Sequence, residues 1–209
     1  MAVKLKSMTK EEIESIAEAF ADYQYEEGEE GLFHLFPDKE AVKVYMRAFV
    51  RAGLRMGWMY ATSERREGYI LFYDSKENPS LPALLDIVKG CLKAFGVKGC
   101  ISFLKTLGNG GESLESRMKK AKKEFIKIEL VAVAKPYQGQ GYMRKALEIA
   151  FREGEKRNLP CILDTDGRLK RDKYVHLGMG PAGTRKIKEN LYLYDLLSDK
   201  HSNPGTEQA

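Results

Sequence analysis

The sequence predicts an α/β (α+β) fold in which helices cover both faces of a mixed, twisted central sheet. The predicted elements run helix, helix, strand, strand, helical tract, strand, helix, strand, helix, strand, strand. The central strand–helix–strand unit requires a right-handed crossover between parallel strands. The paired strands before and after it indicate antiparallel pairing, so the sheet is expected to be mixed.

The length and composition fit one globular domain. The chain has 209 residues, of which 43% are hydrophobic and 31% charged, as in ordinary folded proteins. We expect a single domain over residues 1–197 with a helical insertion at about 79–122. The polar segment 198–209 is predicted to be a disordered tail.

The N-terminal half contains clear helix signals. Thr9, with Glu12 three residues later, has the spacing of a capping box that begins the first helix. The second helix is predicted to start near Pro37–Asp38 and to end at Gly53 as its C-cap. Residues 57–74 indicate two strands joined by the turn 63–67. In the tract 79–122, two helical stretches are separated by the breaker "GNGG".

The C-terminal half alternates between strand and helix patterns. Residues 125–134 and 160–165 indicate strands, and residues 142–157 and 168–177 indicate helices. The last predicted element is a hairpin that turns near Glu189–Asn190.

Charge and cysteine content limit the partners. A net charge of +5 is modest for this length, so we expect no nucleic-acid partner. No apolar run approaches the roughly 20 residues of a membrane span, and we expect no membrane partner and a cytoplasmic location. Cys91, Cys100 and Cys161 are odd in number and widely spaced, which indicates reduced thiols and no metal site.

The stretch "VAVAKPYQGQGYMRKALEIAF" (131–151) places Gly139 and Gly141 between an apolar strand and a helix. Glycines there let a ligand approach the unpaired N–H groups of the helix start, which favours an anion such as a pyrophosphate. The P-loop pattern is absent, and the Rossmann pattern has Arg144 at its third glycine. The pattern Q/R-x-x-G-x-G/A fits Gln138 and Gly141, with Met143 at its final position. A strand-to-helix turn without ligand is the remaining alternative.

This stretch resembles the acetyl-CoA-binding segment of the GCN5-related N-acetyltransferase (GNAT) superfamily. "LDTDGRLKRDKYVHLGM" (163–179) is similar to a second segment of that family. The resemblance implies a GNAT-like acyl-CoA N-acyltransferase fold and acetyl-CoA as co-substrate. It also implies that the cofactor contacts the strand residues Val131, Ala132 and Val133, the loop residues Gln138, Gly139, Gln140, Gly141, Tyr142, Met143 and Arg144, and Lys170, which stands where many relatives have Asn.

Two side chains are the candidate catalytic groups. Glu129 is a carboxylate in an otherwise apolar strand, where relatives often have an acidic base, and strict alternation places it on one face with Lys127 and Val131. Tyr174 occupies the tyrosine position of the second family segment and is the candidate acid. Each also has a structural alternative, a solvated strand end for Glu129 and a core tyrosine for Tyr174.

The resemblance implies an acetyl-CoA-dependent N-acetyltransferase that acts on a small-molecule or peptide amine. The segments Tyr23–Phe36 and 79–122 are expected to shape the acceptor site, with His34 packed rather than catalytic. The alternatives are a catalytically silent CoA-binding sensor or interaction module of the same fold, and transfer of another acyl group. The sequence does not reveal the oligomeric state.

Overall fold

The computed structural model describes residues 2–198, so the predicted tail lies outside it except for Ser198, which ends the last strand. Seven strands form one sheet in the order β1-β2-β3-β4-β5-β7-β6. The strands are β1 (Val3–Lys4), β2 (Met59–Ala61), β3 (Gly68–Asp74), β4 (Ile126–Val133), β5 (Cys161–Asp166), β6 (Gly180–Lys188) and β7 (Leu191–Ser198). The pair β4/β5 is parallel and the other pairs are antiparallel, so the sheet is mixed as predicted.

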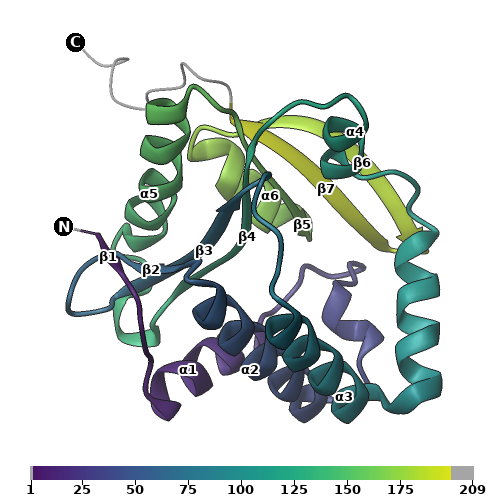
Figure 1. Ribbon diagram of the computed structural model, residues 1–209. Coiled ribbons are helices and arrows are strands. Elements are labelled where there is room, and N and C mark those ends of the chain that lie inside the picture. Colours follow the sequence, from purple (N-terminus) through teal and green to yellow (C-terminus); the bar gives the residue numbers. More distant parts are fainter. Residues whose placement is uncertain (1, 199–209) are drawn as a thin grey trace.

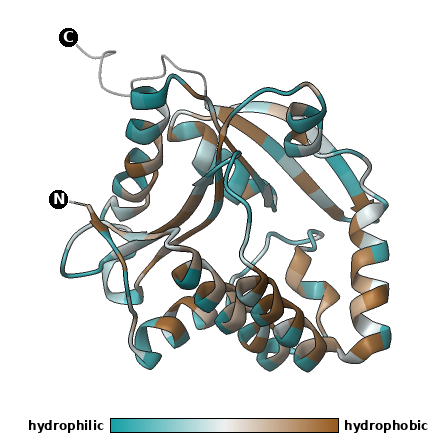
Figure 2. Ribbon diagram, in the orientation of Figure 1, coloured by the Kyte–Doolittle hydropathy of each residue, from teal (hydrophilic) through white to brown (hydrophobic). Residues whose placement is uncertain are grey.

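Helices cover both faces of this sheet (Figure 1). They are α1 (Lys10–Ala21), α2 (Lys39–Met56), α3 (Leu81–Gly108), α4 (Leu114–Lys120), α5 (Tyr142–Arg157) and α6 (Arg168–His176), with short 3-10 turns η1 (Leu32–Leu35) and η2 (Lys135–Tyr137). One core cluster joins α1 and α2 to one face, and a second joins α5 to the other. Figure 2 shows the central strands as largely hydrophobic, in agreement with burial on both faces.

Local sequence signals fix several boundaries. The Thr9 N–H donates to Glu12 Oε2 at 2.7 Å and the Glu12 N–H donates to Thr9 Oγ1 at 3.2 Å, so the predicted capping box forms. Helix α5 has the predicted bounds, and the hairpin between β6 and β7 turns at Glu189–Asn190.

The predicted end of the second helix at Gly53 is wrong. Helix α2 continues to Met56, and Gly57, with a φ of 69°, is its left-handed C-cap. Gly53 lies inside the helix, and a Cβ at this position would stand 2.2 Å from Leu71 Cδ1 of β3. A close approach between helix and sheet therefore explains this glycine.

The tract 79–122 contains more helix than predicted. Helix α3 runs through Gly108 but breaks at Gly96, whose φ of 66° and ψ of 175° are not helical. The two halves turn at this point so that the Sγ atoms of Cys91 and Cys100 lie 2.7 Å apart. Nine residues of unbroken helix would separate these positions by about 13.5 Å. Gly96 therefore acts as an elbow.

Candidate active site

The sheet opens between its two parallel strands. Strands β4 and β5 pair only at Ile126↔Cys161 and Lys127↔Ile162. Beyond Lys127, β4 remains paired with β3, and β5 remains paired with β7 to its end at Asp166. Within residues 2–198, the edge of β4 that faces β5 therefore has no strand partner from Ile128 to Val133. Backbone N–H and C=O groups on such an edge can bind a ligand that carries amides.

A β-bulge places Glu129 at the start of this opening. Leu71 of β3 pairs with Leu130 and Phe72 pairs with Ile128, so Glu129 has no partner in the ladder. The predicted alternation of Lys127, Glu129 and Val131 on one face is therefore wrong at Val131, because the extra residue shifts the pattern. Val131 packs in the core cluster beneath α5, whereas Leu130 packs on the α1–α2 side.

Glu129 is exposed to solvent and has polar neighbours. The Tyr73 hydroxyl donates a hydrogen bond of 3.1 Å to Glu129 Oε1, and the Tyr73 ring stacks on Trp58 at 4.3 Å between centroids. Solvent reaches Glu129, but protein surrounds it on most sides. This enclosure raises the pKa of Glu129, and the nearby Lys127 only partly opposes the rise. Such a carboxylate is a better proton acceptor than an ordinary surface glutamate.

An ion pair between a buried lysine and a partly exposed aspartate marks the point where the strands separate. Lys127, only 3% exposed, contacts Asp164 of β5 through Nζ and Oδ1. Burial opposes the charge of Lys127, but Glu129 and Asp164 raise its pKa. Burial likewise opposes ionisation of Asp164, but Lys127 and Arg185 lower its pKa. Both groups are therefore charged, and the pair ties β4 to β5 below the opening.

Tyr174 lies on the other side of the opening, on α6 after β5. It is half-buried against the core cluster beneath α5. Burial raises the pKa of its hydroxyl, and the negative charge of Asp166 adds to the rise. The hydroxyl therefore remains protonated at neutral pH. Within residues 2–198, no hydrogen bond joins Tyr174 to Glu129.

Asp166, at the end of β5, organises the Tyr174 side. Its carboxylate accepts hydrogen bonds from Lys170 Nζ at 2.6 Å, the Tyr25 hydroxyl at 2.7 Å and the Leu32 N–H at 2.6 Å. The Lys170 ammonium also lies over the rings of Tyr23, at 4.1 Å, and Tyr25, at 4.7 Å. Sequence reasoning missed this network, since Tyr25 and Leu32 lie 141 and 134 positions from Asp166 in the chain. The Lys170 side chain points into the Asp166 network, so a contact between Lys170 and a cofactor phosphate would require the Lys170–Asp166 bond to break.

The Asp166 network makes a stability prediction. Burial opposes ionisation of Asp166, but Lys170, Tyr25 and the Leu32 N–H lower its pKa. We expect Asp166→Asn to lower the free energy of unfolding at pH 7 by about 3–5 kcal/mol, because it leaves the Lys170 charge buried without a partner. Asp166 stabilises the wild type above its unfolded-state pKa of about 3.9 and loses this effect as the pH falls toward the lower folded-state pKa. The difference between variant and wild type should therefore shrink in acid.

Urea unfolding of both chains between pH 7 and pH 3 measures this difference. Asp166→Asn combined with Lys170→Met is the control, and it should recover much of the loss since no unpaired charge remains. A loss below about 1 kcal/mol at pH 7, the value of one ordinary hydrogen bond, would contradict the account.

The glycine loop presents a row of free donors. Gly139 and Gly141 have φ values of 76° and 77°, and Gly141 directly precedes α5. No backbone or side-chain acceptor in the described part of the chain bonds to the N–H groups of residues 139–144. A Cβ at either glycine would meet no protein atom within 4 Å, so the space in front of the loop is open. These features fit a pyrophosphate.

The side chains around the loop leave this space clear. Gln138 Nε2 donates to the Val133 carbonyl at 3.3 Å and Gln140 Nε2 donates to the Pro136 carbonyl at 2.9 Å, so both amides brace the loop. Met143 packs in the core beneath α5 and does not point toward the open side. The departure from the small residue of the family pattern is therefore compatible with ligand approach. Arg144 is half-exposed in the first turn of α5.

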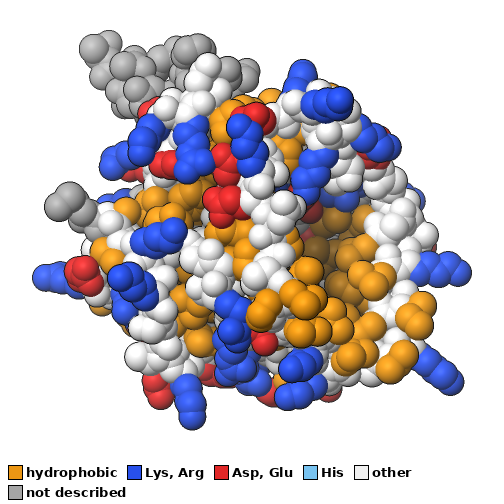
Figure 3. All heavy atoms as spheres, viewed as in Figure 1, with side chains coloured by type: hydrophobic (Ala, Val, Ile, Leu, Met, Phe, Trp, Pro, Cys, Tyr) orange, Lys and Arg blue, Asp and Glu red, His pale blue; other side chains and the backbone are white. Residues whose placement is uncertain are grey.

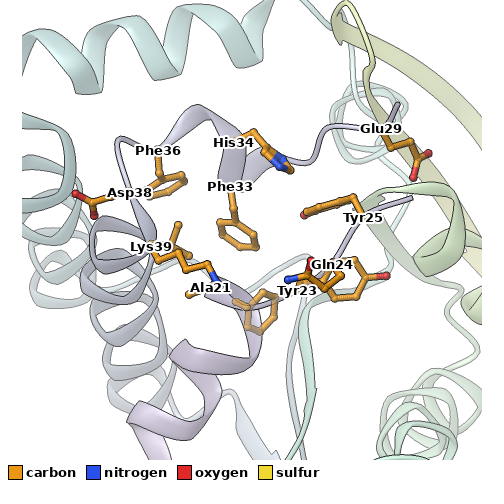
Figure 4. A pocket seen from close by; sticks show the side chains of 12 residues that line it. Ala21, Tyr23, Gln24, Tyr25, Glu29, Phe33, His34, Phe36, Asp38 and Lys39 are labelled. Carbon is orange, nitrogen blue, oxygen red and sulfur yellow. The ribbon is translucent and has the colours of Figure 1, made fainter. Parts of the chain in front are cut away.

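A cavity of about 470 Å³ adjoins the Asp166 network, since Tyr25 lines it and bonds to Asp166. Its aromatic lining comprises Phe20, Tyr23, Tyr25, Phe33 and Phe36, and Figure 4 shows four of these rings, those of Tyr23, Tyr25, Phe33 and Phe36, around one space. His34, expected to be packed, is exposed and lines the cavity, and its Nδ1 accepts the Gly31 N–H at 2.8 Å. Lys39 and Asp38 complete the cavity toward α2.

Comparison with solved structures relates this geometry to known proteins. Arylalkylamine N-acetyltransferase 2 from Aedes aegypti matches with a TM-score of 0.57 and 12% identity, covering 96% of this chain and 99% of that one. An N-acetyltransferase from Staphylococcus aureus Mu50 matches with a TM-score of 0.53 and 17% identity, covering 94% and 99%.

The chain has the GNAT fold. A third match is the histone acetyltransferase HPA2 and related acetyltransferase from Corynebacterium glutamicum, with a TM-score of 0.55, 12% identity and 95% coverage of both chains. No family model matches the sequence, and no curated protein does. A shared fold does not by itself establish the reaction.

Proposed function

We propose that this protein transfers the acetyl group of acetyl-CoA to an amine. One observation carries the proposal: the unpaired donors of residues 139–144 follow the free edge of β4, on which Glu129 lies, and Met143 of the same helix start packs in one core cluster with Tyr174. This arrangement supports a site that combines a row of free N–H donors, a free strand edge, a carboxylate with a raised pKa and a protonated tyrosine. Acetyl-CoA supplies a pyrophosphate, an amide-bearing arm and an activated acetyl group.

The donor side of the gap suits this co-substrate. The N–H groups of the loop residues Gly139, Gln140 and Gly141, and those of Tyr142, Met143 and Arg144 at the helix start, would hold the pyrophosphate. The free edge of β4 from Val131 to Val133 would pair with the amides of the arm. Gln138 braces the loop from behind, and Lys170 is not included in the proposed contacts.

Glu129 is proposed to remove a proton from the acceptor. An alkylamine with a pKa of about 10.4 is neutral in roughly one molecule in 10³ at pH 7. A positioned base can contribute about 10²–10⁴-fold, so Glu129 could recover most of this loss, directly or through a water. Tyr73 holds the carboxylate by its hydrogen bond to Oε1.

Tyr174 is proposed to donate a hydrogen bond and a proton to the sulfur as the bond from sulfur to the acetyl carbon breaks. Its raised pKa keeps the hydroxyl protonated, which this role requires. The proton that the amine loses at Glu129 and the proton that the sulfur gains at Tyr174 balance over the reaction. Solvent returns both groups to their starting states.

The acceptor we propose is a cationic amine that carries an apolar or aromatic body. Carboxylates of Glu115 and Asp164 add negative charge around the base Glu129, against the positive charge of Lys127. The aromatic cavity beside the site already holds one ammonium, that of Lys170, over its rings. Ring faces and carboxylates attract ammonium groups.

Release of free CoA thiol in the presence of an amine panel tests the proposal. The panel should compare aryl-alkyl amines, polyamines, peptide N-termini and lysine peptides. Thiol release above the rate without amine, for at least one member, supports acetyl transfer. Tight CoA binding with no release for any member would instead indicate a sensor of the same fold.

The loop gives a separate binding prediction. We expect Gly141→Val to abolish detectable acetyl-CoA binding, because its branched side chain would stand in the open space before the donors and strain the positive φ. Each charge-assisted bond lost costs about 1.5–3 kcal/mol. Isothermal titration calorimetry of the folded variant measures the change.

Gly111→Val is the matched control. Gly111 also has a positive φ, of 74°, and open space around its Cβ, but it lies in the 79–122 insertion. The Gly111→Val variant should lose a similar amount of folding stability through backbone strain but should keep the wild-type affinity for acetyl-CoA. Equal affinities of Gly141→Val and wild type would remove the loop from the proposed site.

A further inference from the structure

Exposed hydrophobic side chains gather on one element of this protein. Ten large hydrophobic side chains are exposed within residues 2–198, and eight of them belong to α3. Single exposed apolar residues are normal on protein surfaces, but a contiguous set indicates an interaction site. Figure 3 shows hydrophobic side chains massed over α3.

The first half of α3 has two apolar faces. The outer face carries Leu81, Leu84, Leu85, Val88 and Leu92, which are between 41% and 69% exposed. Their spacing of 3, 4, 7 and 11 residues from Leu81 places them along one side of a helix. The inner face already packs on α2, where a Cβ at Gly90 would lie 2.4 Å from Ala48 Cβ. The hydrophobic residues of the outer face are therefore not needed to pack α3 against the core.

The second half repeats the pattern beyond the Gly96 elbow. Val97, Ile101 and Leu104 are 63–66% exposed and recur every three or four residues. Phe103 faces inward and stacks on Phe95 at 4.8 Å between centroids, which holds the two halves together. The elbow thus presents two adjoining apolar strips, which we call the α3 outer face.

Lysines border the α3 outer face. Lys89, Lys93, Lys98 and Lys105 are exposed, and none forms a salt bridge with another described residue. Each follows an outer-face residue by one position, so all four lie on the same flank of their helix half. Asp86, the acidic residue of α3, is already paired with Arg55 at 2.9 Å.

We propose that the α3 outer face rests on the surface of an anionic lipid bilayer. Leucine and valine side chains would enter the boundary between headgroups and acyl chains, and the lysines would meet phosphate groups. Charge decides against a second copy of the chain, because two outer faces would bring their unpaired lysines together without acidic partners. The sequence expectation of no membrane partner considered a spanning segment, and no helix of the described residues is long and apolar enough to be one. An interfacial helix does not need that length.

Co-sedimentation with vesicles tests the proposal on the full chain. We expect binding to mixed phosphatidylglycerol–phosphatidylcholine vesicles, weaker binding to pure phosphatidylcholine, and weakening by salt. Leu85→Glu with Val88→Glu should reduce binding to both vesicles by at least about tenfold, since it removes buried apolar groups and adds repelled charge. Lys93→Gln with Lys98→Gln should reduce binding to anionic vesicles by about fivefold per lysine and should leave binding to pure phosphatidylcholine vesicles unchanged.

Leu169→Glu is the matched control, since Leu169 of α6 is also exposed, at 42%, but lies outside the α3 outer face. It should bind vesicles like the wild type. Equal vesicle binding by Leu85→Glu/Val88→Glu and wild type would overturn the proposal. Absence of vesicle binding by the wild type would overturn it as well. If the wild type were then a dimer and Leu85→Glu/Val88→Glu a monomer, a second copy of the chain would cover the α3 outer face.

Discussion

Tyr174→Phe is expected to slow acetyl transfer at pH 7 by roughly 10²–10⁴-fold, the usual contribution of a positioned acid or base. The variant keeps the ring that packs beneath α5 but loses the proton that the departing sulfur would take. Its stability should stay within about 1 kcal/mol of wild type, because no hydrogen bond of the Tyr174 hydroxyl to another described residue would be lost.

The pH dependence of this defect separates catalysis from packing. Thiols have a pKa of about 8.5, so the departing sulfur needs an acid less as the pH rises. The defect of Tyr174→Phe should therefore shrink above about pH 9, when the initial rates of both enzymes are compared over pH 6–10. Tyr60→Phe, on β2 and stacked on Phe72, serves as the control and should behave as wild type. If Tyr174→Phe kept the wild-type kcat at pH 7, Tyr174 would have only a packing role in the core.

Glu129→Gln is expected to lower kcat by a similar roughly 10²–10⁴-fold while leaving the affinity for acetyl-CoA unchanged. The amide keeps the shape of the side chain in the bulge but cannot accept the proton of the amine. Enclosure raises the pKa of Glu129, so wild-type activity should rise with pH through a value above the usual 4.3 of glutamate. This acidic limb should be absent from the variant.

Tyr73→Phe tests the same assignment without removing the base. The Tyr73 hydroxyl donates to the carboxylate and so favours its charged form. Its loss should move the acidic limb to higher pH, an effect that a purely structural tyrosine would not produce. Glu148→Gln, in an exposed ion pair on α5, is the control for glutamate loss. Full kcat for Glu129→Gln across pH 6–9 would assign the base to another residue or to water.

These two variants also bear on the sensor alternative. A CoA sensor would bind acetyl-CoA through the loop and would have no use for a proton acceptor at Glu129 or a donor at Tyr174. The retained carboxylate, with its pKa raised by enclosure, favours the enzyme.

Local sequence signals were sufficient where neighbouring residues decide the structure. The capping box at Thr9, the bounds of α5 and the β6–β7 turn all depend on residues within a few positions of one another. The glycine loop belongs to this group, since the positive φ angles of Gly139 and Gly141 and the helix start that follows are local properties. The order of elements along the chain was therefore enough to predict the mixed sheet.

Only the tertiary structure decided the features that depend on distant partners. Gly53 reads as a helix end in sequence, but the approach of Leu71 from β3 requires a glycine inside the helix. The bulge at Glu129 arises from the register of β4 against β3, which turns Val131 to the opposite face from the one that alternation predicts. The hydrogen bond from Tyr25 to Asp166 joins residues that are 141 positions apart in the chain. Side-chain periodicity and helix capping depend on residues within one or two turns of the chain. Strand register, the separation of β4 from β5 and buried ion pairs depend on which distant segments meet in space, and local sequence patterns do not determine this.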